Sequence, residues 1–200
     1  MAPGDRDPSR VRSFVAVLID DATRAALATQ VEILRRAAPR VVWVAPENLH
    51  LTLKFLGAVD QVLLEPIAHG LREALSGASA FDIQVVGLGV FPAATRPRVV
   101  WAGVTAGRPH LTELAARVQT AVAPFGFAPE NRPFSGHLTL GRVREPRRDD
   151  RLSSLIDDSA GRVFGTVRVV AVSLMKSVLA PSGARYSEMT RISLGGPKSS

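Results

Sequence analysis

The sequence contains no cysteine, so disulfide bonds and thiolate metal sites are excluded. It also has no apolar run long enough to cross a membrane. Its first ten residues, MAPGDRDPSR, lack the apolar segment that a signal peptide needs. A chain without cysteine is compatible with a reducing compartment. These absences predict a cytoplasmic protein with no membrane-bound part.

The motifs of several common enzyme classes are absent as well. The sequence has no G-x-S-x-G, no Walker-type phosphate loop, no dinucleotide-binding fingerprint and no H-E-x-x-H. The segment Gly87-Leu88-Gly89 lies inside a strand-like pattern, where a pair of glycines indicates a bulge rather than a phosphate loop. The chain has four histidines and no third ligand at a usable spacing, so we expect no metal site and no cofactor.

Acidic residues are outnumbered by basic ones. There are 18 Asp and Glu against 25 Lys and Arg, which gives a formal net charge of +7. The apolar fraction of 46% and the charged fraction of 22% are those of an ordinary globular protein. A basic excess favours polyanionic partners, and phosphate esters and nucleic acid are the common ones.

Two of the four histidines lie in identical four-residue words. His50–Leu53 and His137–Leu140 both read HLTL. The alternation of polar and apolar residues predicts two half-buried strands, in which residues two apart share a face. The leucines of each word should point into a core, and the histidine and threonine should point together to the other face. A coincidence between two core strands would explain the leucines but not the repeated polar pair. We therefore hypothesise two strands that line the two walls of one groove.

Two imidazoles across a groove are suited to general acid–base catalysis, because an unperturbed histidine titrates at about 6.5. One imidazole would take a proton from the attacking water or hydroxyl, and the other would give a proton to the leaving oxygen of a phosphodiester. His50 and His137 are therefore the candidate catalytic pair, and the two motifs are too similar to assign the roles. The hydroxyls of Thr52 and Thr139 are candidate ligands of the phosphate oxygens.

Two basic residues close to the HLTL words are further candidates for phosphate binding. Strand parity places Lys54 on the same face as His50, where its ammonium could offset developing negative charge. Arg142 has the opposite parity to His137, so it reaches the groove only if its strand twists or bulges there.

The remaining pattern predicts an α+β fold. Strand–helix–strand units on either side of about residue 90 each supply one HLTL strand. This indicates a duplicated, pseudo-two-fold, bilobal fold, with antiparallel sheets lining a central groove and helices on the outside. We expect helices near residues 20–38, 60–76, 108–123 and 149–158.

The domain boundaries follow from composition. Residues 1–10 are predicted to be a disordered leader, 11–194 a single domain of two lobes, and 195–200 a loose tail. The first HLTL strand should stop at Gly57, and a turn at 181–183 should close a final hairpin.

The motifs resemble one enzyme family closely. A pair of HxTx words about ninety residues apart is similar to the two-histidine (2H) phosphoesterase superfamily, and in particular to its RNA 2′,3′-cyclic phosphodiesterases, historically called 2′-5′ RNA ligases. The block WV followed by PENLHLTLKFLG, ending at Gly57, is very like that group's first motif. Similar matches are Arg98–Trp101 to its middle strand, Arg132–Phe134 before the second motif, and the spacing from Ser177 to Tyr186 in the terminal hairpin. The similarity runs from about residue 12 to 194.

Two positions depart from the family pattern. Gly136 stands where a proline is common before the second histidine, and Met175-Lys176 stands where Tyr-Glu is usual. Neither departure touches the HxT words.

The resemblance implies an activity and a set of roles. These are the metal-free hydrolysis of a terminal 2′,3′-cyclic phosphate on RNA to a 2′-phosphate, with His50 as proton donor and His137 as proton acceptor. The expected partners are RNA with such ends or small cyclic nucleotides, and we expect a monomer. Two alternatives stay open: a 2′-5′ RNA ligase or 2′-5′ phosphodiesterase using the same site, and a basic RNA-binding module without turnover.

Overall fold

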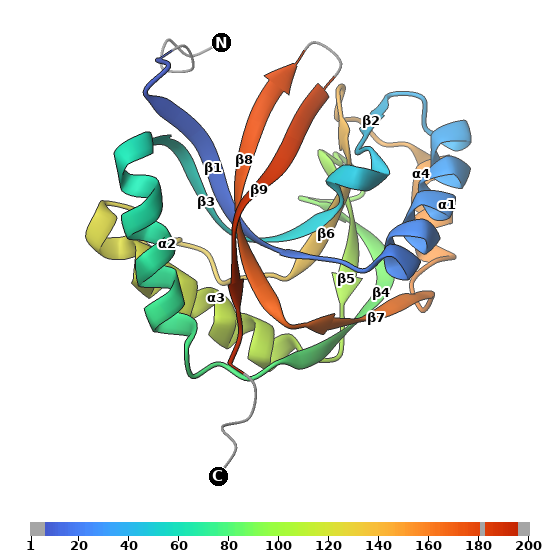
Figure 1. The fold of residues 1–200 in the computed structure, drawn as a ribbon. Coiled ribbons are helices and arrows are strands. Elements are labelled where there is room, and N and C mark those ends of the chain that lie inside the picture. The colour runs from blue at the N-terminus through green and yellow to red at the C-terminus, as the bar shows by residue number, and fades with distance from the viewer. Residues whose placement is uncertain (1–6, 181–182, 196–200) are drawn as a thin grey trace.

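The computed structural model describes residues 7–180 and 183–195. Within these ranges the chain forms nine β-strands, four α-helices and two short 3-10 helices (Figure 1). The strands are β1 (Arg10–Leu18), β2 (Val41–Trp43), β3 (His50–Asp60), β4 (Phe81–Phe91), β5 (Val99–Val104), β6 (His137–Val143), β7 (Val163–Val169), β8 (Ala171–Ala180) and β9 (Gly183–Ser193). The helices are α1 (Asp21–Ala37), α2 (Gln61–Leu75), α3 (Arg108–Val122) and α4 (Asp150–Asp157), with 3-10 helices η2 (Pro46–Asn48) and η3 (Ala123–Phe125).

The strands form one curled antiparallel sheet. Its order is β7-β4-β5-β6-β3-β1-β8-β9, and β2 pairs with β6 beside β3. The two HLTL strands, β3 and β6, are therefore neighbours at the centre, with three further strands on either side of the pair. The α+β class and the antiparallel arrangement are confirmed, and the sheets expected for the two lobes are continuous with each other.

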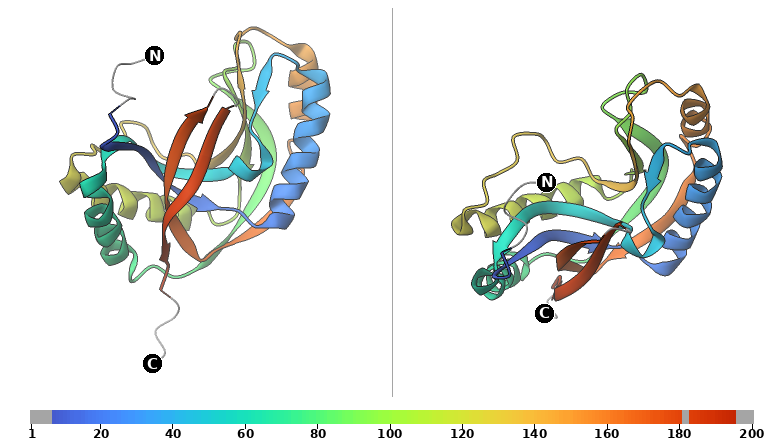
Figure 2. Two further views of the ribbon diagram at one scale, coloured as in Figure 1. Left: turned by 45° about the horizontal axis from the view of Figure 1, so that its top comes forward. Right: turned by 90° about the horizontal axis from the view of Figure 1, so that it is seen from above.

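The helices cover the sheet in two pairs. Figure 2 shows α2 and α3 at one end of the curled sheet and α1 and α4 at the other. Three of the helices begin where the sequence predicts, because an aspartate caps each first turn: Asp20 accepts from the Thr23 amide, Asp60 from Val62, and Asp149 from Leu152. The helix positions expected from the apolar spacing are confirmed.

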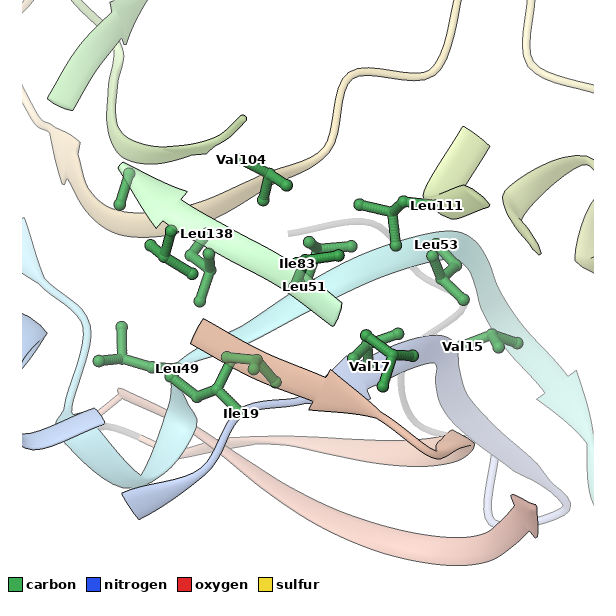
Figure 3. Close-up of a cluster of buried hydrophobic side chains, with 14 of the residues drawn as sticks. Val15, Val17, Ile19, Leu49, Leu51, Leu53, Ile83, Val104, Leu111 and Leu138 are labelled. Atoms are coloured by element: carbon green, nitrogen blue, oxygen red, sulfur yellow. The ribbon is translucent and has the colours of Figure 1, made fainter. Parts of the chain in front are cut away.

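A single large core lies between the helices and the sheet. The leucines of both HLTL words are buried in it, and Leu51 and Leu138 have no exposed surface. Figure 3 shows Leu51 and Leu53 together with Val15 and Val17 from the neighbouring strand β1. The predicted inward orientation of the leucines is confirmed.

The strands β3 and β6 meet at equivalent positions of their two words. Leu51 pairs with Leu138 in the antiparallel register. Continued by one residue in each direction, this register sets His50 opposite Thr139 and Thr52 opposite His137. Leu51 and Leu138 are both the second residue of their word, so this residue pair lies on the local two-fold axis that relates the two halves of the repeat. The face of the sheet that carries both histidines and both threonines is called the site face below.

A β-bulge interrupts the alternation in β3. Against strand β1, Ala16 pairs with Thr52 but the next residue, Val15, pairs with Lys54. Leu53 is therefore the extra residue of a bulge, which reverses the side-chain parity beyond it. Lys54 follows Leu53 to the core face and is buried, with 5% of its surface exposed.

The same bulge occurs at the same position of the second word. Against strand β5, Trp101 pairs with Thr139 but Val100 pairs with Gly141. Leu140 is the extra residue here, and Gly141 takes the core-facing position that Lys54 has in β3. The twist or bulge that Arg142 needs to reach the site face is therefore present.

Two local predictions about glycines have different outcomes. Gly87 has a φ of 73° and lies at a register shift between β4 and β5, so the expected bulge is confirmed. Gly57 does not end β3, which continues to Asp60. Its φ of 70° instead lets the strand pass through a second register shift against β1, and the predicted stop at Gly57 is wrong.

The first residues that the structure describes already take part in the fold. β1 begins at Arg10, and the Ser9 carbonyl accepts a hydrogen bond from the Gln61 amide, so the last residues of the expected leader join the fold. Residues 1–6 of that leader, 181–182 of the hairpin turn and 196–200 of the tail lie outside the described residues. In the ranges that are described, no helix combines the length and the apolar character needed to span a membrane.

The tight packing over the second bulge leads to a first prediction. A Cβ atom at Gly141 would lie 2.5 Å from Val41 Cγ1 and 2.9 Å from Trp43 Cε3, so Gly141→Ala must displace β2. We expect a loss of about 1–3 kcal/mol of unfolding free energy in urea denaturation. The control is Gly161→Ala, where no atom lies within 4 Å of the added methyl group. Equal stability of the two variants would contradict this account of the bulge.

Candidate active site

The 3-10 helix η2 positions the first histidine. It lies directly before β3, and its Asn48 carbonyl lies 2.7 Å from His50 Nδ1. A carbonyl oxygen can only accept, so Nδ1 carries the proton and donates it. The other ring nitrogen, Nε2, is then the reactive atom, and it lies 3.0 Å from Thr52 Oγ1. In the neutral imidazole the Thr52 hydroxyl donates to Nε2.

The second histidine is held in the same way. His137 Nδ1 lies 2.8 Å from the carbonyl of Ser135, which again stands two residues before the histidine. The same reasoning assigns the proton to Nδ1 and leaves Nε2 for chemistry. Both imidazoles therefore have one tautomer imposed by the backbone, which is the preparation that proton transfer through Nε2 requires.

Aromatic rings support each imidazole. The His50 ring centroid lies 4.7 Å from that of Phe14 on β1 and 5.1 Å from that of Tyr186 on β9, the latter edge to face. The His137 ring lies 5.2 Å from Phe91 on β4 and 6.5 Å from Trp101 on β5, both edge to face. None of these four aromatic residues is assigned a catalytic role from the sequence, because they come from four strands scattered along the chain and only the sheet brings them together.

Burial changes the acidity of the first histidine. Desolvation under Phe14 and Tyr186 lowers the pKa of His50, and the hydrogen bond to the Asn48 carbonyl acts weakly in the opposite direction. The free protein therefore holds His50 predominantly neutral at neutral pH. An anion next to Nε2 would favour its protonated form.

Because of the two bulges, each of the two candidate cations faces the side of the sheet opposite to the one that strand parity predicts, and Arg142 faces the site. Phe91 contacts His137, so its side chain lies on the site face. Val99 pairs with Phe91 on one side and with Arg142 on the other, and paired residues point to the same face of a sheet. The side chain of Arg142 therefore also lies on the site face. The exposed guanidinium of Arg142 thus belongs to the face that carries the histidines.

Lys54 is placed on the opposite side. Its ammonium donates to the Ala128 carbonyl at 2.6 Å and contacts the Glu130 carboxylate at 3.1 Å. The expected sharing of a face with His50 is wrong, because the bulge at Leu53 reverses the parity. Its role in phosphate binding stays a prediction, and these contacts instead hold the loop that leads to Ser135 and His137.

An alignment of the two HLTL words already indicates that Lys54 is not a ligand position. When the two HLTL words are aligned, Lys54 corresponds to Gly141 and Phe55 corresponds to Arg142. Gly141 has no side chain that could bind phosphate, so the position directly after the HLTL word cannot bind phosphate in the second half of the repeat. Strand parity alone could not reveal the bulge.

Metal-binding groups are not clustered. Among the residues that the structure describes, no three His, Asp or Glu side chains gather closely enough to hold a metal ion.

Comparisons with known proteins agree with the motifs. The model of a family described as the 2′-5′ RNA ligase superfamily matches residues 23–179. An RNA 2′,3′-cyclic phosphodiesterase of Methanothermobacter thermautotrophicus is 39% identical over 180 residues, which are 90% of this chain and 97% of that protein.

Solved structures share the fold. The crystal structure of TT0787 of Thermus thermophilus has a TM-score of 0.75 and 28% identity, and covers 92% of this chain and 98% of that one. E. coli LigT in complex with 3′-AMP has a TM-score of 0.71 and 24% identity over 92% of this chain and 98% of its own.

The depressed pKa of His50 predicts a pH dependence of stability. Below about pH 6.5 the unfolded chain binds a proton at this residue that the folded protein resists, so the unfolding free energy falls as the pH falls. We expect a larger loss between about pH 7.5 and 5.5 for the wild type than for His50→Gln, measured by urea denaturation. His69→Gln, at an exposed residue, is the control and should behave as the wild type. An equal loss in His50→Gln and the wild type would contradict the assignment.

The two cations make a second test possible. If Lys54 anchors the loop and Arg142 faces the site, Lys54→Met should change the affinity for inorganic phosphate less than Arg142→Gln does. Arg142→Gln should lower it roughly tenfold, because a charge-assisted hydrogen bond is lost. Calorimetric titration measures both. Weaker phosphate binding in Lys54→Met than in Arg142→Gln would restore Lys54 as the phosphate ligand.

Proposed function

This chain belongs to the 2′-5′ RNA ligase superfamily, and we propose that it is a metal-independent RNA 2′,3′-cyclic phosphodiesterase. The observation that carries the proposal is the pair of imidazoles from the repeated words. Each donates Nδ1–H to a backbone carbonyl two residues earlier and keeps Nε2 for chemistry. Such a pair supports a reaction in which one proton is accepted and another is donated.

The proposed reaction is the opening of the cyclic phosphate by water. His137 Nε2 takes a proton from the water as its oxygen attacks phosphorus. The bond from phosphorus to the ribose 3′ oxygen breaks, and that oxygen takes the proton of the His50 imidazolium. The products are a 2′-phosphate and a 3′ hydroxyl group, and exchange of protons with solvent restores the histidines. The assignment of His50 as donor and His137 as acceptor rests on the family resemblance.

The lowered pKa of His50 adds a condition to this assignment. A neutral His50 cannot donate, so the free protein is not prepared for the reaction at neutral pH. The negative charge of a bound phosphodiester beside Nε2 favours the imidazolium and raises the pKa again. On this proposal, protonation of His50 accompanies substrate binding.

The phosphate oxygens need ligands besides the histidines. We propose that Thr52 and Thr139 bind the non-bridging oxygens, since each hydroxyl lies opposite the histidine of the other word in the strand register. Arg142 would add the charge that stabilises the transition state. The net charge of +7 supports RNA as the polyanion that carries the cyclic end. We also propose that the protein acts as a monomer in the cytoplasm.

Removal of either histidine tests the proposal. His50→Ala and His137→Ala should each lower hydrolysis of RNA with a 2′,3′-cyclic end by at least about 100-fold, with EDTA present throughout. Product analysis should find the phosphate at the 2′ position. His69→Ala, an exposed residue on α2, is the control. Near-normal turnover in both variants would exclude the two-histidine mechanism, and loss of wild-type activity in EDTA would exclude metal independence.

The same assay separates the alternatives. A binding module would hold the RNA with salt-dependent affinity and leave the cyclic end intact. A 2′-5′ ligase or phosphodiesterase would join or cut 2′-5′ linked RNA faster than it opens the cycle.

A further inference from the structure

Asn48 makes two different contacts, one through its backbone and one through its side chain. Its carbonyl accepts the Nδ1 proton of His50 at 2.7 Å. Its side-chain nitrogen Nδ2 donates to the carbonyl of Ala184 on β9 at 2.8 Å. A carbonyl can only accept a hydrogen bond, so the amide must present its nitrogen there. One residue of η2 therefore connects the first imidazole with a strand that lies 136 residues further along the chain.

Ala184 belongs to a part of the β8–β9 hairpin that has left the rest of the sheet. β8 pairs with β1 over residues 173–176, whereas β8 and β9 stay paired with each other beyond that point. We call residues 177–180 and 183–187 the hairpin arm. Figure 1 shows the hairpin diverging from β1 in this region. The position of the arm therefore depends on contacts other than the ladder with β1.

Tyr186 and Asn48 hold the arm near the site. Val178 and Leu179 in the arm are 48% and 60% exposed, so these side chains contribute little packing. Tyr186 packs on Phe14 of the site face, with ring centroids 5.1 Å apart, edge to face. The hydrogen bond from Asn48 adds a directional contact to the backbone of β9.

Tyr186 closes a ring of contacts around the first histidine. It lies two residues after Ala184 on β9, and its ring meets the His50 imidazole edge to face, with 5.1 Å between the centroids. The members of the ring of contacts, in order, are His50, Asn48, Ala184 and Tyr186. The imidazole is thus held at Nδ1 and beside its ring by two groups that the Asn48 side chain joins together.

The second HLTL word has no counterpart of the side-chain contact among the residues that the structure describes. Ser135 stands where Asn48 stands, two residues before the histidine, and its carbonyl binds His137 Nδ1. The side chain of Ser135 is shorter and exposed. The carbonyl contact therefore belongs to the repeat, and the side-chain contact distinguishes the half that carries His50.

We propose that Asn48 is a positioning residue that ties the hairpin arm to His50 and keeps Nε2 of the imidazole aimed at the reacting phosphate. Asn48 touches no reacting atom and acts through the His50 ring on one side and through Tyr186 on the other. The consequence for turnover rests on the proposed function, whereas the consequence for the geometry of His50 does not. Proton transfer depends steeply on the position of the donor, so loss of the Asn48 side chain should slow the chemical step more than it weakens RNA binding.

The first experiment measures the geometry of the free protein by NMR, at a pH where His50 is neutral. Tyr186 is the only tyrosine of the chain, so its ring signals need no further assignment. In the wild type, Overhauser effects should connect this ring with the His50 ring, and the imidazole nitrogen shifts should show one tautomer with the proton on Nδ1. Asn48→Ala should weaken the Overhauser effects and mix the tautomers. Asn48→Ser, which copies the residue of the second word, should behave in the same way and replaces Asn48→Ala if that variant does not fold.

Gln61→Ala is the matched control. The Gln61 side-chain amide donates to the Pro8 carbonyl at 2.6 Å, so this variant also removes a bond between an amide and a backbone carbonyl, at the first residue of α2. It should leave the contact between Tyr186 and His50, the tautomer and the turnover as they are in the wild type.

The second experiment measures the chemical step with RNA that carries a 2′,3′-cyclic end. In single-turnover assays, Asn48→Ala should slow the opening of the cycle roughly threefold to tenfold, the range that one hydrogen bond supplies, and should change the Kd for the RNA less. Tyr186→Leu should slow the opening as well. In the double variant the two effects should be less than multiplicative, because both act on His50 through the same arm.

Each result decides for or against the inference. Unchanged Overhauser effects and a single tautomer in both Asn48 variants would overturn it. Fully multiplicative effects in the double variant would limit Asn48 to a role in the stability of η2 and would overturn it as well. If the wild type leaves the cyclic end intact, the proposed function fails, and the NMR comparison still decides the role of Asn48.

Discussion

The pairing of Leu51 with Leu138 is the constraint on which the site depends. Both leucines are fully buried, so the register between β3 and β6 cannot slip by one residue without exposing the leucines and burying the histidines. The hydrophobic effect acts on the core side of the strands and thereby holds the polar side chains on the opposite face. The geometry of an acid–base pair thus comes from burial of leucine, and the imidazoles themselves contribute little to it.

The two bulges give the site its chemical asymmetry. Each word has an extra leucine at its fourth position, and each bulge turns the following residue inward and the next one outward. In β3 the inward residue is Lys54, which the loop carrying Glu130 neutralises, and in β6 it is Gly141, over which Val41 and Trp43 pack. The outward residues are an aromatic and a guanidinium. A duplicated backbone therefore carries two different ends, which is what an asymmetric substrate such as a nucleotide needs.

Local backbone geometry prepares the imidazoles for proton transfer. In both words the carbonyl two residues before the histidine binds Nδ1–H, so the tautomer is decided within three residues of sequence. The aromatic neighbours come from distant strands and differ between the halves. The burial that they impose on His50 lowers its pKa in the free protein.

The sequence alone determined the parts of this protein that depend on neighbours along the chain. The inward leucine faces of the HLTL words and the approximate positions of the four helices follow from local periodicity, and the structure confirms them. The family and the candidate histidines follow from the same words. Only the tertiary structure decided that Lys54 faces inward and Phe55 and Arg142 outward, because a bulge is defined by the register against β1 and β5, and those strands lie far away in sequence. Only the fold brought Phe14, Tyr186, Phe91 and Trp101 to the histidines, since contacts across a sheet depend on strand order, which no single strand encodes.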